Sequence, residues 1–139
     1  MQTQKIFKMA TQAFIGLSAV SLLSVSVLAF YNPQSVMDLV AVKLTNNDAF
    51  SSIRGVYGGV GFTLFISLIY LLRTDVNKGL AFLALLWGFY AFSRLITIFA
   101  EGSLGAFGKQ WLVTETLFFT LAMVLLWKNK NLVVLKTTK

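Results

Sequence analysis

Three ionisable side chains interrupt apolar stretches of the sequence, and they are the residues best placed to do chemistry. Arg54 begins the second apolar stretch, Arg94 interrupts the third, and Glu115 lies inside the fourth. A charged side chain in hydrocarbon costs at least about 2.5–3.5 kcal/mol on insertion scales, so such residues usually face the protein interior and pair. We therefore expect Glu115 to pair with Arg94 or with Arg54.

This polar cluster has three interpretations. It can lock helices together, or it can form a pocket in which guanidinium groups bind an anionic or carbonyl-bearing ligand, such as a lipid headgroup. In the third interpretation Glu115 couples the movement of protons or ions. We expect Glu101 and Asp48, at the mouth of the pocket, to balance the other arginine. Tyr57 lies three residues after Arg54, on nearly the same helical face, and is a further candidate ligand.

The composition removes several classes of chemistry. The chain has no Cys and no His, so disulfides, Cys/His zinc sites, His-ligated haem and a Ser-His-Asp triad are excluded. An all-oxygen metal site would have to be built from five acidic residues. We predict no metal and no cofactor. The net charge of +7 is not arranged as a basic face with interleaved aromatic residues, so we do not expect nucleic acid as a partner.

The elements that position these residues are long and apolar. Of the 139 residues 57% are hydrophobic and 12% are charged, whereas a soluble domain has roughly 45–50% apolar and about 25% charged residues. Four segments without strand-like alternation each have about the ~20 residues that cross hydrocarbon as a helix. We predict an all-α integral membrane four-helix antiparallel bundle, with helices at about residues 9–31, 53–72, 79–100 and 110–127.

The connections between these segments are of unequal length. Residues 32–54 form the longest polar connection, and residues 35–42 within it fit a short interfacial helix. Residues 101–109 form a glycine-rich loop, and residues 128–139 are predicted to be a basic cytoplasmic tail. Length indicates a single transmembrane domain over residues 1–139.

Basic residues predict the orientation of the chain. One set of flanks and loops holds eight Lys and Arg, namely Lys5, Lys8, Arg73, Lys78 and the four lysines after Trp127, and the other holds Lys43, Arg54 and Lys109. Because Lys and Arg are enriched on the cytoplasmic side, we predict that both ends are cytoplasmic. This orientation places the charges of the second, third and fourth segments at similar depth in the outer half of the membrane.

Glycines cluster at the start of the second segment. Gly55, Gly58, Gly59 and Gly61 follow Arg54, and Gly55 with Gly59 forms a small-xxx-small pair. Small residues let helix backbones approach closely in lipid. We expect these glycines to pack against a neighbouring helix of the same chain, and a second copy of the chain is the alternative.

The sequence resembles an uncharacterised family of small bacterial four-helix membrane proteins, known as domain of unknown function 4345. The residues that carry the resemblance are Asn47-Asp48, the run Arg54-Gly55-Val56-Tyr57-Gly58-Gly59, Arg94-Leu95, Glu101-Gly102 and Glu115. The resemblance spans about residues 10–127. It implies four helices and a multi-pass location in a bacterial inner membrane, and it supplies no activity.

We therefore expect a small, non-enzymatic membrane protein that binds a lipid, a small amphiphile or a partner helix at an outer-leaflet Arg/Glu pocket. One alternative is a small oligomeric transporter or channel subunit, and another is a membrane enzyme acting on a lipid-soluble substrate. The expected partners are membrane lipids, together with a homo-oligomer or a partner membrane protein.

Overall fold

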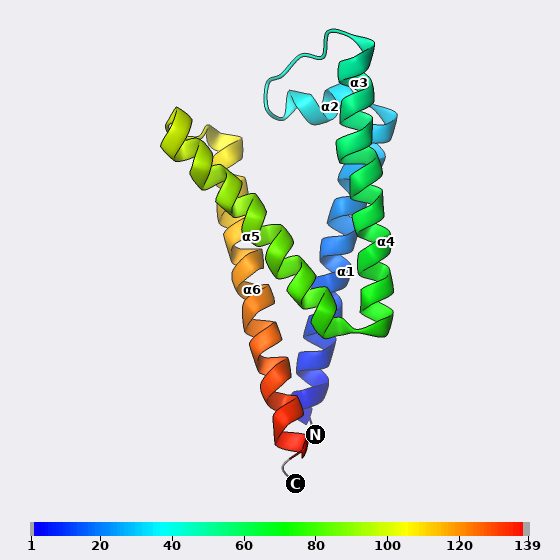
Figure 1. Ribbon diagram of the computed structural model, residues 1–139, viewed down its shortest axis with the longest axis vertical. Coiled ribbons are helices and arrows are strands. Elements are labelled where there is room, and N and C mark those ends of the chain that lie inside the picture. Colours follow the sequence, from blue (N-terminus) through cyan, green and yellow to red (C-terminus); the bar gives the residue numbers. More distant parts are fainter. Residues whose placement is uncertain (1, 138–139) are drawn as a thin grey trace. The chain divides into compact units, whose positions relative to one another are not determined.

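The computed structural model describes residues 2–137, and all of the regular structure in this part of the chain is helical. This confirms the all-α class. Figure 1 shows the helices in chain order. They are α1 (Gln2–Tyr31), α2 (Pro33–Asp38), α3 (Asn47–Ile53), the π-helical stretch η1 (Arg54–Gly59), α4 (Val60–Thr74), α5 (Val76–Glu101) and α6 (Ala106–Thr137).

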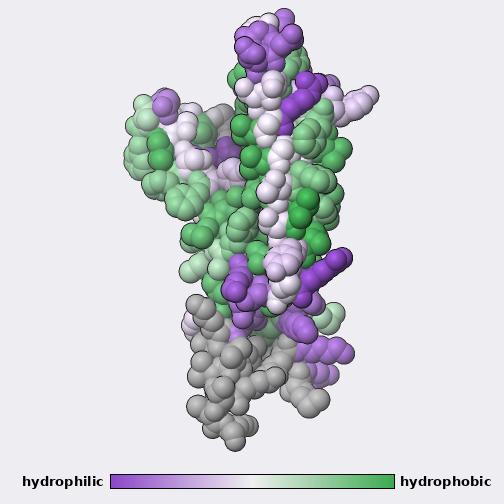
Figure 2. All heavy atoms as spheres, turned by 45° about the vertical axis from the view of Figure 1, so that its right-hand side comes forward, coloured by the Kyte–Doolittle hydropathy of each residue, from purple (hydrophilic) through white to green (hydrophobic). Residues whose placement is uncertain are grey.

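Four helices are long and apolar enough to cross a membrane. The candidate spans are Lys5–Tyr31, Asn47–Thr74, Val76–Glu101 and Ala106–Asn129, and the second of them joins α3, η1 and α4 into one continuous helix. Large apolar side chains remain at the surface, with Phe99 88% exposed. Figure 2 shows hydrophobic residues over much of the visible surface. Exposed apolar area on this scale is stable in lipid and not in water, so the chain is a multi-pass membrane protein.

The helices extend beyond the apolar segments that reveal them. The second span begins at Asn47, because the Asn46 side chain caps it by accepting a hydrogen bond from the Ala49 amide at 2.8 Å. α6 begins at Ala106 and continues to Thr137, so residues 128–137, which the hydropathy pattern assigns to a tail, are helical. The rest of the predicted tail, residues 138–139, lies outside the described residues. Hydropathy predicts which residues lie in lipid, but it does not predict the residues at which a helix begins or ends.

Capping residues set the other boundaries. α1 ends at Tyr31, and the adjoining Asn32 caps α2, which has Pro33 in its first turn. Asp75 caps α5 by accepting hydrogen bonds from the amides of Asn77 and Lys78, both at 3.1 Å. The bond from the Lys78 amide, the largest cause, lowers the pKa of Asp75 below its usual range.

The chain divides into two compact units, which we describe separately. The first contains α5, α6 and the part of α1 up to Ile15. α5 and α6 lie side by side and antiparallel (Figure 1). Trp87 of α5 meets Phe118 of α6 edge to face, with ring centroids 5.1 Å apart, and Phe14 of α1 meets the same Phe118 at 5.6 Å. Aromatic packing thus forms the centre of this unit.

The second unit, Gly16–Arg73, is built on α1 and the second span. The Ser26 hydroxyl of α1 donates a 2.6 Å hydrogen bond to the Gly58 carbonyl of η1. Beside α2, the buried residues Ala29, Val36 and Met37 form a small apolar cluster. Assembly of both units into one antiparallel bundle and one domain, with both ends cytoplasmic, stays a prediction.

Candidate functional site

Arg94 and Glu115 form a two-pronged ion pair between α5 and α6. The Arg94 Nε donates to Glu115 Oε2 at 2.6 Å, and an Arg94 Nη donates to Glu115 Oε1 at 2.8 Å. The Glu115 side chain is 3% exposed and the Arg94 side chain 23% exposed. Of the two pairings expected for Glu115, the structure shows the one with Arg94. The fork satisfies both carboxylate oxygens and is a strong form of this interaction.

The antiparallel arrangement of α5 and α6 places these two residues at matching height. Arg94 lies seven residues before the end of α5 at Glu101, and Glu115 lies nine residues after the start of α6 at Ala106. At 1.5 Å per residue these distances are roughly 11 and 14 Å from the short connection between the helices. Both residues therefore lie within the spans, where ionisable groups pair or face a cavity.

A polar stripe on α5 accompanies Arg94, and hydropathy alone does not reveal it. Tyr90, Ser93, Arg94, Thr97 and Glu101 recur at helical spacing and so lie along one face. The Ser93 hydroxyl donates to the Tyr90 carbonyl at 2.8 Å, and the Thr97 hydroxyl donates to the Ser93 carbonyl at 3.1 Å. Ser93, Thr97 and Glu101 are exposed. In the sequence, this stripe could have been recognised from the i, i+3, i+4, i+7 spacing of polar residues counted from Tyr90.

A buried polar atom lies two turns away on the same helix. The indole N–H of Trp87 is buried and has no hydrogen-bond partner among the residues that the structure describes. Trp87 precedes Arg94 by seven residues, so it is on nearly the same face and roughly 11 Å along the helix. Most buried donors in native proteins have a partner, so an indole N–H without one among the described residues is unusual.

Arg54 and Tyr57, the other two residues expected to bind a ligand, belong to the second unit. The Arg54 Nε donates to the Phe30 carbonyl near the end of α1 at 3.2 Å. Arg54 and Tyr57 are both exposed and lie in η1. π-Helical turns are rare and frequently occur at functional sites. Arg54 thus contacts the backbone of α1. That Arg54 and Arg94 line one pocket stays a prediction. That Glu101 balances the charge of an arginine also stays a prediction.

The glycines of the second span fall into two pairs. A Cβ on Gly58 would lie 2.8 Å from the ring of Phe30, and a Cβ on Gly61 would lie 3.1 Å from the Cβ of Ser26. A Cβ on Gly55 or Gly59 would have nothing within 4 Å apart from its chain neighbours and the nearby backbone of its own helix. Close approach to α1 therefore uses Gly58 and Gly61, and the expected packing of Gly55 and Gly59 within the chain is not found.

The described residues contain no group of three or more His, Cys, Asp or Glu side chains that could hold a metal ion. The two acidic groups near the ion pair are used differently. Glu115 is fully engaged by Arg94, and Glu101 is exposed at the end of α5. The polar groups described at this site are the guanidinium of Arg94, the carboxylate of Glu115 and the hydroxyls of Ser93 and Thr97.

The sequence matches a family model described as Domain of unknown function (DUF4345) over residues 10–126. The chain belongs to this family. The DUF4345 match includes both partners of the ion pair, the polar stripe and η1. No curated protein and no solved structure matches the chain.

Proposed function

We propose that the protein is a non-enzymatic membrane protein that binds a lipid-soluble molecule with a carbonyl-bearing headgroup beside Arg94. The observation that carries the proposal is the partial exposure of an ion-paired guanidinium within a membrane span. A guanidinium has five N–H donors, and Glu115 accepts from two of them. The remaining donors belong to a side chain that is 23% exposed.

The charge of the pair favours an uncharged ligand. Glu115 neutralises Arg94 at a separation of 2.6 Å, so the site as a whole carries no net charge. An anionic headgroup would have to approach the Glu115 carboxylate as well. A carbonyl or ester oxygen accepts from the remaining N–H groups without that repulsion, and the hydroxyl oxygens of Ser93 and Thr97 extend the polar surface. A neutral lipid with ester carbonyls, such as a diacylglycerol, has this chemistry.

The test is binding of dioleoylglycerol to the purified, delipidated protein, measured by native mass spectrometry from detergent. The informative variant is the double substitution Arg94→Met with Glu115→Leu. Replacing both partners of a buried pair by apolar residues of similar size is often neutral or stabilising, so this variant should keep its fold. Hydrogen bonds to charged groups contribute about 1.5–3 kcal/mol, so we expect binding to weaken about tenfold or more.

The matched control is Arg73→Met, which removes an exposed arginine at the end of α4. It should bind dioleoylglycerol as the native chain does. A folded double variant that binds as tightly as the native chain would overturn the proposal. Tighter binding of phosphatidylglycerol than of dioleoylglycerol would contradict the argument from charge. The oligomeric transporter and the membrane enzyme stay predictions that no contact among the described residues favours.

A further inference from the structure

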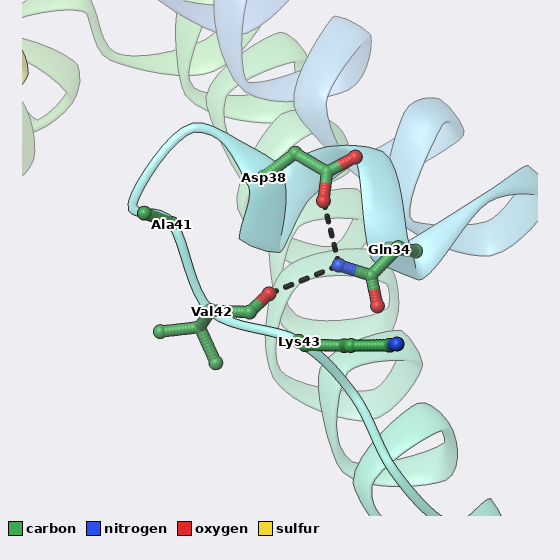
Figure 3. A pocket seen from close by; sticks show the side chains of 5 residues that line it. All are labelled: Gln34, Asp38, Ala41, Val42 and Lys43. Carbon is green, nitrogen blue, oxygen red and sulfur yellow. Dashed lines mark hydrogen bonds between the residues drawn. The ribbon is translucent and has the colours of Figure 1, made fainter.

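A shallow cavity of about 370 Å³, wide open to the surface, lies beside α2 and the segment that follows it, within the second unit. Gln34, Asp38, Ala41, Val42 and Lys43 line it, and Figure 3 shows their side chains. Its volume falls within the roughly 300–1,000 Å³ typical of small-molecule sites. The stripe beside Arg94 belongs to the other unit, so this cavity is a separate feature.

The wall of the cavity is held by a network of hydrogen bonds. The Gln34 amide nitrogen donates to Asp38 Oδ1 at 2.6 Å and to the Val42 carbonyl at 2.9 Å (Figure 3), while the Gln34 amide oxygen accepts from the Leu44 amide at 2.9 Å. Ala41 has a φ of 57°, which is uncommon for a residue with a Cβ. Such conformations persist where the surroundings impose them, and they cluster at ligand sites.

The cavity presents one positive and one negative side chain. Asp38 and Lys43 are both exposed. The ion pairs in the described part of the chain join other residues, Asp75 with Lys78 and Arg94 with Glu115. Asp38 uses one carboxylate oxygen to accept from Gln34, and its other oxygen remains for a donor. The site therefore offers separate partners for an anion and for a cation.

Exposed apolar residues lie between these two charges in the sequence, in the connection that joins the first two spans. The first span ends at Tyr31 and the next begins at Asn47, so the connection between them starts and finishes at one surface of the bilayer. Leu39 is 52% exposed, Val40 49% and Val42 47%. An exposed apolar run next to opposite charges matches a molecule that has a zwitterionic head and hydrocarbon tails.

We propose that this cavity binds the headgroup of a zwitterionic phospholipid with a primary ammonium group, such as phosphatidylethanolamine. Lys43 binds the phosphate as a flexible point charge. The free oxygen of Asp38 accepts a hydrogen bond from the ammonium group, which a trimethylated choline cannot donate. Leu39, Val40 and Val42 contact the upper part of the acyl chains. A lipid held here ties the connection between the first two spans to the membrane surface.

The experiment measures binding of phosphatidylethanolamine, phosphatidylcholine and phosphatidylglycerol to the delipidated full chain by native mass spectrometry. We expect phosphatidylethanolamine to bind tightest. Exposed ion pairs contribute about 0.2–1 kcal/mol, so Lys43→Gln and Asp38→Asn should each weaken its binding by up to about fivefold. Asp38→Asn keeps the oxygen that accepts from Gln34, so the wall of the cavity should remain folded, which circular dichroism checks.

Matched controls are Lys109→Gln and Asp48→Asn, which remove the same charges from exposed positions outside the cavity. They should leave phosphatidylethanolamine binding unchanged. Equal loss in the controls, or no loss in folded Lys43→Gln and Asp38→Asn, would overturn the proposal. Displacement of the lipid by an equal concentration of glycerophosphoethanolamine would assign the cavity to a water-soluble ligand instead. In the Arg94→Met/Glu115→Leu background, Lys43→Gln and Asp38→Asn should still weaken phosphatidylethanolamine binding, which separates this proposal from binding of ester carbonyls at Arg94.

Discussion

Arg94 and Glu115 are bound to each other but are unequally protected from their surroundings. Glu115 is 2% exposed as a residue and is the one buried acidic residue in the described part of the chain. Its two oxygens depend on the guanidinium, whereas Arg94 has further donors and partial access to the surface. Removing the carboxylate and removing both partners should therefore have different consequences.

We predict that Glu115→Gln destabilises the detergent-solubilised protein. The change leaves a half-buried guanidinium without its counter-charge. Breaking a buried pair costs about 3–5 kcal/mol in soluble proteins, and the partial exposure of Arg94 places the expected loss near the lower end. Thermal unfolding in a fixed detergent measures it. The Arg94→Met/Glu115→Leu double variant should recover most of the loss, because the two positions are coupled. A melting temperature for Glu115→Gln equal to that of the native protein would show that the pair does not stabilise the fold.

At the scale of elements, the second span owes its fit against α1 to particular glycines in and after η1. The Gly58 carbonyl accepts from Ser26, and the ring of Phe30 lies where a Gly58 side chain would be. The nearby Gly59 has open space at its Cβ position. Neighbouring glycines in one helical stretch thus have opposite environments, although the sequence presents them as one cluster.

We predict opposite effects of two alanine substitutions in η1. Gly59→Ala should stabilise the protein by up to about 1 kcal/mol, because alanine is favoured over glycine within helices and meets no atom here. The free energy of unfolding of Gly58→Ala should be about 1–3 kcal/mol lower than that of Gly59→Ala, because the new Cβ forces the Phe30 ring to move. Phe30 is 46% exposed and can rotate, so the low end of that range is expected. Equal melting temperatures for the two variants would contradict the packing described for Gly58.

At the scale of the whole molecule, the feature to test is how the chain is threaded through the membrane. Four helices have the length and apolar composition of spans, and their connections are short except for residues 32–46. With four crossings, the connections at Thr45 and Ser103 share one side of the membrane, and the connection at Asp75, next to Lys78 in the first turn of α5, lies on the other. The excess of Lys and Arg predicts that the side with Lys78 and both chain ends is cytoplasmic.

The absence of cysteine makes this topology directly measurable. We expect Thr45→Cys and Ser103→Cys to react with a membrane-impermeant maleimide on intact cells. Lys78→Cys, with a side chain that is 77% exposed, should react after permeabilisation. The native chain is the unlabelled control. The reverse pattern would show that the orientation is wrong, and labelling of Thr45→Cys and Lys78→Cys from the same side would exclude four crossings.

The sequence by itself determined the membrane class, the presence of four helical spans and the pairing of Glu115 with an arginine. Apolar length sets where a chain enters lipid, and the cost of an unpaired charge in hydrocarbon makes Glu115 pair with an arginine. Residue types and spacing left open which arginine that is, because Arg54 and Arg94 are chemically alike and at similar predicted depth. The antiparallel packing of α5 on α6 brings Arg94, and not Arg54, into contact with Glu115.

Tertiary structure also decided which glycines lie against α1, and it formed the cavity beside α2 from residues of the long polar connection. The physical reason is that pairing and burial depend on which faces of two helices meet. That relation joins residues far apart in the chain, such as Ser26 and Gly58. Local features, such as apolar runs and capping residues, depend on neighbours within a few positions and so can be recognised before the fold is known.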